Sequence, residues 1–180
     1  SKLVEKKISS QTVYKGNFLD VKKDNVVLPN GKNSTREWIN HPGAVVIVPI
    51  LPNGKIALIR QFRYAMGSEF IELPAGKIDK GETPDECAIR ELEEEIGFKT
   101  KNLNFIAMIH PAIGFTNENM SLYLATDLVQ TNINRDSDEF LELMPTSLEH
   151  ALDLVWSNKI TDVKTIIGIL WYQKIYQESK

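Results

Sequence analysis

Residues 76–98, GKIDKGETPDECAIRELEEEIGF, constrain the fold more than any other stretch of this sequence. A glycine-containing acidic turn leads into one helix whose start and end are both marked. Thr83 suits the N-cap, Glu86 the reciprocal position of a capping box, and Gly97 the C-terminal stop. The chain must therefore fold around one short helix with defined ends.

The predicted helix has two different faces. The apolar face, which should pack on a core, consists of residues at helical spacing: Ala88, Ile89, Leu92 and Ile96. The acidic face carries Glu91, Glu94 and Glu95, three and four residues apart. Like charges at this spacing cost about 0.2–0.5 kcal/mol, and the C-terminal half of a helix disfavours anions. Arg90 is the one nearby side chain that offsets them.

Two interpretations of the acidic face are open. The simpler one is a solvated surface that carries no chemistry. The other is a cation site, because converging carboxylates beside a loop carbonyl are the oxygen ligands that Mg²⁺ or Mn²⁺ prefers.

Composition limits the function classes. A chain of 180 residues suits one domain, or one domain with a small appendage. The net charge of −3 gives no electrostatic footprint for nucleic acid, and no apolar run is long enough to span a bilayer. Cys87 is the one cysteine, so an intrachain disulfide is impossible and a cytoplasmic location fits. We expect Cys87 to be a packed small residue rather than a nucleophile.

The first forty residues predict a thin antiparallel sheet. Candidate strands cover residues 12–15, 18–28 and 34–39, with a Pro29-Asn30-Gly31 turn between the last two, and residues 1–9 should be a partly ordered end. A sheet this thin must pack on the main domain or on another subunit. The break at residues 41–43 then divides the chain into an N-terminal sheet, residues 1–41, and a main domain, residues 42–180.

The main domain interleaves strands with helices. An almost entirely apolar run over residues 44–51 predicts a strand buried on both faces. Further strands are expected at residues 55–64, 70–73, 103–110, 121–128 and 139–144, and helices at residues 147–157 and 162–176. The last helix should bury this set of apolar residues: Val163, Ile166, Ile167, Leu170 and Trp171. Without a regular βαβ repeat, we expect a mixed sheet between helices.

Three further groups of residues could carry chemistry. Arg63 ends a strand just ahead of the acidic loop, where it could hold a phosphate or be an ordinary surface arginine. Arg36 and Glu37, next to an aromatic residue, could grip a nucleobase or simply pair across strands. The polar loop that contains Asp138 and Glu139 is either solvated or a source of the base that activates water.

The spacing in residues 76–98 also resembles a known pattern, the Nudix box. Every fixed position of that pattern is matched by Gly76, Glu82 and the run Arg90-Glu91-Leu92-Glu93-Glu94-Glu95-Ile96-Gly97-Phe98. The flanks resemble one branch of the Nudix hydrolases, the ADP-ribose pyrophosphatases and related nucleoside diphosphate sugar hydrolases. These matches include His41-Pro42-Gly43-Ala44-Val45, Arg60-Gln61-Phe62-Arg63-Tyr64 and Glu72-Leu73-Pro74-Ala75-Gly76. The resemblance implies an α+β fold: a Nudix-type α/β/α sandwich with a mixed β-sheet, plus a small N-terminal antiparallel sheet.

The resemblance also implies a role for each matching residue. The metal ligands would be Glu91 and Glu95, with Glu94 assisting and the Ala75 carbonyl completing the site. Glu82 would help through water or by contacting the ligands rather than the metal, and Arg90 would brace the glutamates.

Substrate contacts and the catalytic base follow from the same resemblance. Arg63 would contact the diphosphate, and Arg36 and Glu37 would lie near the base. The N-terminal sheet would be exchanged between the subunits of a homodimer. Glu139 is favoured as the catalytic carboxylate, with Asp138 and then Glu118 as alternates.

The implied reaction is Mg²⁺-dependent hydrolysis of a nucleoside diphosphate sugar, such as ADP-ribose, to a nucleoside monophosphate and a sugar phosphate. Many members of this branch have Ser-Asp-Glu where this chain has Thr116-Asn117-Glu118, which leaves the base and the sugar open. A preference for GDP-mannose and a non-catalytic module that senses nucleotide sugars are the alternatives. A metal buffer or plain interaction domain ranks last.

Overall fold

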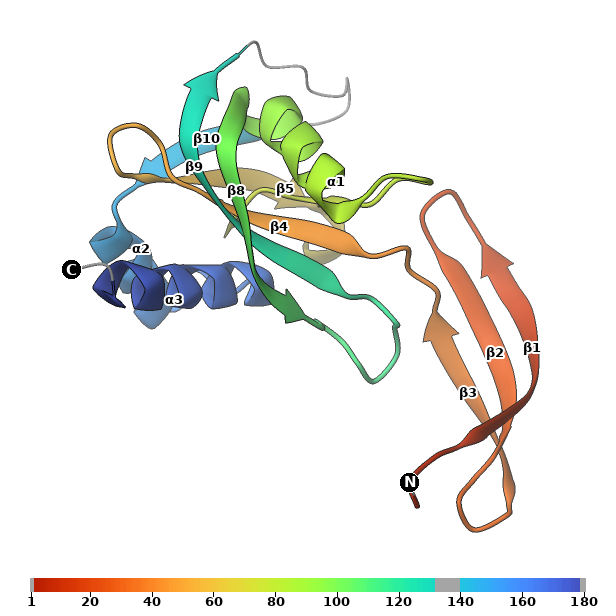
Figure 1. The fold of residues 1–180 in the computed structure, drawn as a ribbon. Helices are drawn as coiled ribbons and strands as arrows, with labels where there is room; N and C mark the ends of the chain where they lie inside the picture. Colours follow the sequence, from red (N-terminus) through yellow and green to blue (C-terminus); the bar gives the residue numbers. More distant parts are fainter. Residues whose placement is uncertain (1, 132–139, 179–180) are drawn as a thin grey trace. The chain divides into compact units, whose positions relative to one another are not determined.

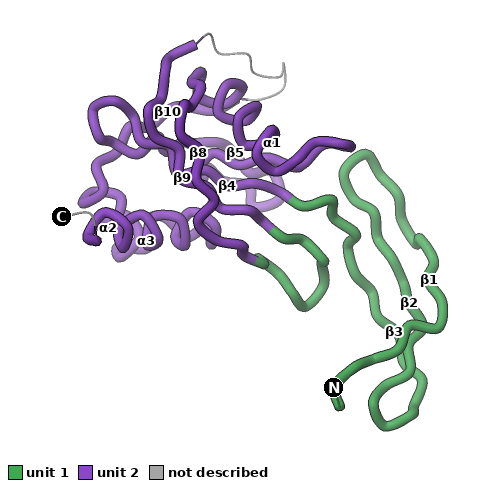
Figure 2. Tube along the Cα trace, in the orientation of Figure 1, with its two compact units in different colours: residues 1–43, 110–119 green, residues 44–109, 120–180 purple. Residues whose placement is uncertain are grey.

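A computed structural model describes residues 2–131 and 140–178 of this chain. It divides into two compact units, shown in Figure 2. Unit 1 comprises Ser1–Gly43 and His110–Asn119, and unit 2 comprises Ala44–Ile109 and Met120–Lys180. The loop at residues 110–119 thus groups with the N-terminal sheet, although it lies far along the chain from it.

Unit 1 is a three-stranded antiparallel sheet in the order β1-β2-β3. Its strands are β1 (Lys6–Lys15), β2 (Asp20–Val27) and β3 (Asn33–Ile39). The expectation of a loosely ordered start was wrong for residues 6–9, because β1 pairs with β2 from Lys6 onward. The predicted turn before β3 is present, with Gly31 at φ 82°.

Unit 2 contains two sheets. The larger has the order β7-β4-β9-β8 and the smaller β10-β5-β6. The strands are β4 (Ala44–Pro49), β5 (Ile56–Arg63), β6 (Ser68–Glu72), β7 (Ala75–Lys77), β8 (Phe98–Ile109), β9 (Met120–Gln130) and β10 (Leu141–Thr146). Strand β4 pairs antiparallel with β7 and parallel with β9, so the larger sheet is mixed, as predicted.

Helices cover both faces of the larger sheet (Figure 1). Helix α1 (Pro84–Glu91) continues into a π-helical turn, η2 (Leu92–Ile96), and lies on one face; α2 (Leu148–Trp156) and α3 (Val163–Glu178) lie on the other. A short 3-10 helix, η1 (Tyr64–Met66), follows β5.

Strand β4 divides the core between these two layers. All six of its residues are buried, as the apolar run predicted. Val45 and Ile47 pack with the α1 side of the core, and Val46 and Val48 pack with the α2 and α3 side. This alternation is what a strand covered on both faces requires, and it confirms the predicted α/β/α sandwich.

Two predicted apolar faces need correction. In α1, Ile89 is 40% exposed, and Cys87 is buried in its place. Burial raises the pKa of the Cys87 thiol to about 12, which fits a packed residue rather than a nucleophile. The face of the helix that packs on the core therefore carries Cys87, Ala88 and Leu92.

In α3, the buried face consists of Lys164, Thr165, Gly168, Ile169 and Tyr172. The predicted face was wrong: Val163 and Trp171 are exposed, and Ile166, Ile167 and Leu170 are half-buried. The physical reason is close packing at a small residue. A Cβ placed on Gly168 would lie 2.3 Å from Leu73 Cδ1, so the helix approaches the core through its glycine.

Among the described residues, no helix has both the length and the apolar character that crossing a bilayer requires.

Candidate active site

The acidic helix begins as the sequence predicts. The Thr83 hydroxyl accepts a hydrogen bond from the Glu86 backbone N–H at 3.3 Å, and a Glu86 carboxylate oxygen accepts one from the Thr83 N–H at 2.8 Å. Gly97 ends the helical segment at φ 72°. The π-helical turn η2 between these ends was not predicted, and it carries Glu94 and Glu95. Such turns occur often at functional sites.

Arg90 forms hydrogen bonds with several carboxylates of the acidic face. Its Nε donates to Glu82 Oε1 at 2.8 Å, and its Nη1 donates to both Glu91 Oε1 and Glu94 Oε2 at 2.8 Å. Hydrogen bonds from Arg90 lower the pKa of Glu82 to about 2. Contacts with the same carboxylates, Glu82 first, raise the pKa of Arg90. The bracing role that the family resemblance implies for Arg90 has this geometric support.

The loop before the helix lies directly against its acidic face. A Cβ added to Gly76 would lie 1.7 Å from Glu91 Oε1, so only glycine fits there without displacing that carboxylate. The Ala75 N–H donates to Glu95 Oε2 at 3.1 Å. Strand β7 and the helix are therefore held together by the residues expected to bind a metal.

The donor chemistry of this cluster fits a hard divalent cation. Glu91 and Glu95 are buried, at 7% and 4% exposure, and carboxylate and carbonyl oxygens are the ligands that Mg²⁺ takes. Within residues 2–131 and 140–178, no three His, Cys, Asp or Glu side chains gather closely enough to hold a metal. Arg90 occupies one oxygen of Glu91 and one of Glu94.

Arg63 reaches the neighbourhood of this cluster from β5. Its Nε and Nη2 donate to the two carboxylate oxygens of Glu72 at 2.7 and 2.6 Å, and its side chain is 45% exposed. The hydrogen bond to Glu72 raises the pKa of Arg63, and the charge of Glu95 contributes to the same shift. Arg63, Ala75 and the helix glutamates thus all belong to unit 2.

The other predicted site residues lie in unit 1. Arg36 donates to Ser34 Oγ at 3.2 Å and to the Thr35 carbonyl at 2.9 Å, and it pairs with Glu5. Glu37 pairs with Lys23 at 3.5 Å.

Glu118 also belongs to unit 1, where it lies 3.9 Å from His41 Nε2. The same loop contains a contact that sequence reasoning missed: Asn117 Oδ1 accepts from the His41 backbone N–H at 2.7 Å. Asp138 and Glu139, the favoured catalytic carboxylates, lie outside the described residues.

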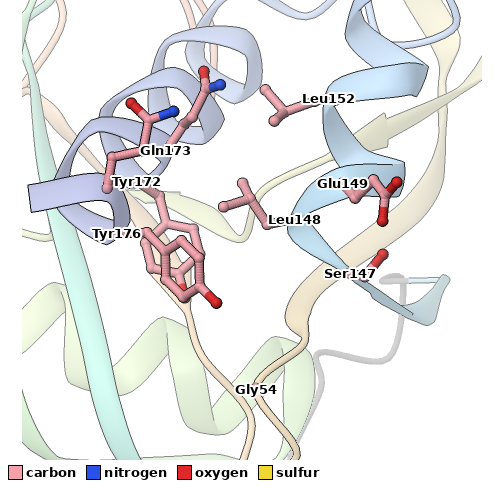
Figure 3. Close-up of a pocket in the computed structure, with 9 residues that line it drawn as sticks. Gly54, Ser147, Leu148, Glu149, Leu152, Tyr172, Gln173 and Tyr176 are labelled. Carbon is pink, nitrogen blue, oxygen red and sulfur yellow. The ribbon is translucent and has the colours of Figure 1, made fainter. Parts of the chain in front are cut away.

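A separate pocket of about 540 Å³ lies between α2 and α3 (Figure 3). Its walls include Leu148 and Leu152 from α2, and Tyr172 and Tyr176 from α3. Among the described residues that line it, Glu149 is the one carboxylate. Because hydrolysis of the predicted kind needs several carboxylates, the acidic cluster on α1 and η2 is the better candidate.

Comparisons with known proteins show which family the chain resembles. The family model described as "NUDIX domain" matches residues 40–163, and "Nucleoside diphosphate sugar hydrolase N-terminal domain" matches residues 5–39. The chain is 41% identical over 173 residues to an ADP-ribose pyrophosphatase of Bacillus subtilis (strain 168), covering 95% of this chain and 94% of that protein. It is 36% identical over 171 residues to a methanol dehydrogenase activator of Bacillus methanolicus, covering 94% and 92%. A solved structure of an ADP compounds hydrolase superposes with a TM-score of 0.87 at 25% identity, covering 97% and 95%.

Proposed function

Because this chain belongs to the Nudix family of hydrolases, we propose that it cleaves the diphosphate of a nucleoside diphosphate sugar, with ADP-ribose the first candidate. Water adds across one P–O bond, and the products are a nucleoside monophosphate and a sugar phosphate. The observation that carries the proposal is the cluster in which Arg90 binds Glu82, Glu91 and Glu94 beside the loop at Gly76. GDP-mannose is the alternative substrate.

The proposed metal ligands are the Ala75 carbonyl, Glu91, Glu94 and Glu95, and the cation is Mg²⁺, with Mn²⁺ as a substitute. When bound, the cation would polarise the phosphoryl oxygens and lower the pKa of a bound water. Arg90 keeps the glutamates in place, and Arg63 presents the exposed part of its guanidinium to a phosphate.

The proposed contacts to the rest of the substrate come from other segments. Arg36 and Glu37 would contact the base, and Glu139 would hold or deprotonate the attacking water, with Asp138 and Glu118 as alternates.

We further infer a cytoplasmic homodimer that exchanges its N-terminal sheet, residues 1–41, while residues 42–180 form the hydrolase domain. The fully exposed strand β1 supports this pairing, because an exposed edge strand can pair with another chain.

A product-resolved substrate screen tests the proposed function. The purified protein is incubated with ADP-ribose, GDP-mannose and UDP-glucose, with Mg²⁺, with Mn²⁺ or with EDTA. We expect formation of a nucleoside monophosphate and a sugar phosphate, and we expect EDTA to abolish this reaction. For Glu94→Gln, kcat/KM should fall about 10- to 100-fold. Glu149→Gln, on the exposed surface of α2, is the matched control and should match the wild type.

Unchanged turnover in E94Q, or hydrolysis that resists EDTA, would contradict the assigned site. Tight binding of a nucleotide sugar with no product would instead favour the sensor alternative. The similarity to a methanol dehydrogenase activator is the specific observation that supports a regulatory role as the alternative.

A further inference from the structure

A buried group of charged side chains lies behind Arg63. The Glu72 side chain is 2% exposed and accepts hydrogen bonds from Arg63 Nε and Nη2 at 2.7 and 2.6 Å. Its Oε2 also accepts one from Lys164 Nζ at 2.5 Å, although the two residues are 92 positions apart. Lys164, at the start of α3, is 10% exposed and donates to Asp162 Oδ2 at 2.9 Å.

The charges of this group balance as a set of four. A buried carboxylate is costly unless it is paired and hydrogen-bonded. Glu72 and Asp162 carry two negative charges, and Arg63 and Lys164 carry two positive ones. Because Lys164 neutralises part of the Glu72 and Asp162 charge, Arg63 is not the sole counter-ion of Glu72. The exposed side of its guanidinium therefore keeps more of its positive potential for a phosphate.

The start of α3 also holds the backbone that leads to the predicted metal site. Thr165 Oγ1 accepts a hydrogen bond from the Leu73 N–H at 2.8 Å. The Pro74 carbonyl accepts one from the Ile47 N–H at 2.9 Å, and the Ala75 N–H donates to Glu95 at 3.1 Å. The segment at residues 73–75 is thus tied to α3, to β4 and to η2.

We propose that Lys164 is a positioning residue: by holding the Glu72 carboxylate from the α3 side of the sheet, it fixes the guanidinium of Arg63 where a substrate phosphate binds. This role rests on the proposed diphosphate hydrolysis. Removal of the Lys164 charge would leave the group with a net charge of −1, which disfavours an anionic substrate. It would also leave Glu72 with one fewer hydrogen-bond donor, so that the Arg63 geometry would loosen.

Kinetics of Lys164→Met on the substrate found in the screen give the first test. Methionine has a similar volume but no charge. We expect kcat/KM to fall about 10- to 100-fold, mainly through a higher KM, while the protein keeps its circular dichroism spectrum. Lys174→Met is the matched control, because Lys174 lies on the same helix with a 64% exposed side chain; its kinetics should match the wild type. Lys164→Arg, which keeps the charge, should recover part of the loss.

A double-variant cycle separates positioning from a general structural role. If Lys164 acts through Arg63, adding K164M to Arg63→Met should cause little further loss of kcat/KM. If the two losses of kcat/KM multiply in the double variant, the proposal is overturned, because Lys164 would then act independently of Arg63.

A readout independent of activity distinguishes failure of this proposal from failure of the proposed function. In the ¹⁵N spectrum, the Arg63 Nε–H signal is identified by its disappearance in R63M. We expect K164M to shift it and to speed its exchange with water, and K174M to leave it in place. An unchanged signal in K164M overturns the positioning role. A shifted signal in a protein that hydrolyses no nucleotide sugar supports that role and rejects the hydrolysis. If K164M does not fold, Lys164→Gln supplies the same comparison.

Discussion

At the residue scale, Gly76 shows how closely the loop and the acidic helix approach each other. Its φ lies outside the left-handed region, so the backbone itself would accept a side chain. The obstacle is Glu91, whose Oε1, Cδ and Cγ would lie 1.7, 1.9 and 2.5 Å from a new Cβ. Glu91 is buried and bonded to Arg90, so it cannot move without disturbing the cluster.

We therefore predict that Gly76→Ala lowers kcat/KM about 10- to 100-fold, while it destabilises the fold by about 1–3 kcal/mol. The displaced side chain is a proposed ligand, so activity should suffer more than the melting temperature. Kinetics and thermal melting measured on the same sample check this. Gly114→Ala, where a Cβ would meet nothing within 4 Å, should leave the melting temperature unchanged. Normal kinetics in G76A would show that the position of Glu91 is unimportant.

At the element scale, α3 depends on Gly168 for its packing. A Cβ there would lie 2.3 Å from Leu73 Cδ1, 3.2 Å from Val48 Cγ2 and 3.4 Å from Leu122 Cδ1. Alanine is favoured over glycine in a helix by about 1 kcal/mol, but overpacking a core costs about 1–3 kcal/mol. Because Leu73 is fully buried, the overpacking should win.

The prediction is that Gly168→Ala lowers the melting temperature by several degrees, since 1 kcal/mol corresponds to about 2–4 °C in a protein of this size. Val163→Ala, on the exposed side of α3, should change stability by less than about 0.5 kcal/mol. Calorimetry of the two variants measures both shifts. If G168A is more stable than the wild type, the Leu73 side chain can move to accommodate the new methyl group without destabilising the core.

These elements also show what sequence can predict. The start of α1 and the buried strand β4 were predicted correctly, because capping residues and an unbroken apolar run are local signals. The buried face of α3 was not, because apolar residues occur on every side of that helix, including Ile169 and Tyr172 on the buried one. The role of Lys164 had no local signal at all, because its partner Glu72 is 92 positions away.

At the scale of the whole molecule, the two units differ in what stabilises them. Among the described residues of unit 1, Val26 is the one buried apolar side chain, whereas unit 2 contains two extended apolar clusters. Both units contain ion pairs, but unit 1, with so small a core, depends more on its charge contacts. Asp20 pairs with Lys22 at 2.9 Å and with Lys15 at 3.2 Å, and its Oδ2 accepts a hydrogen bond from Asn40 at 3.1 Å.

This difference predicts that acid destabilises unit 1 before unit 2. Hydrogen bonds from Lys22 and then Asn40 lower the pKa of Asp20 from 3.8 to about 2. Because the folded-state pKa is the lower one, the stabilisation from Asp20 is complete above about pH 4 and is lost as the pH falls through 2. Asp24 has a lowered pKa too, with a hydrogen bond from Ser10 as the largest cause. NMR titration between pH 5 and 2 should show unit 1 amide signals losing dispersion first, and Asp20→Asn should cause the same loss at higher pH. Two results would contradict this account: an Asp20 carboxyl that titrates near pH 4, or unit 2 signals that lose dispersion first. Either would mean that the charge contacts of unit 1 do not compensate for its small apolar core.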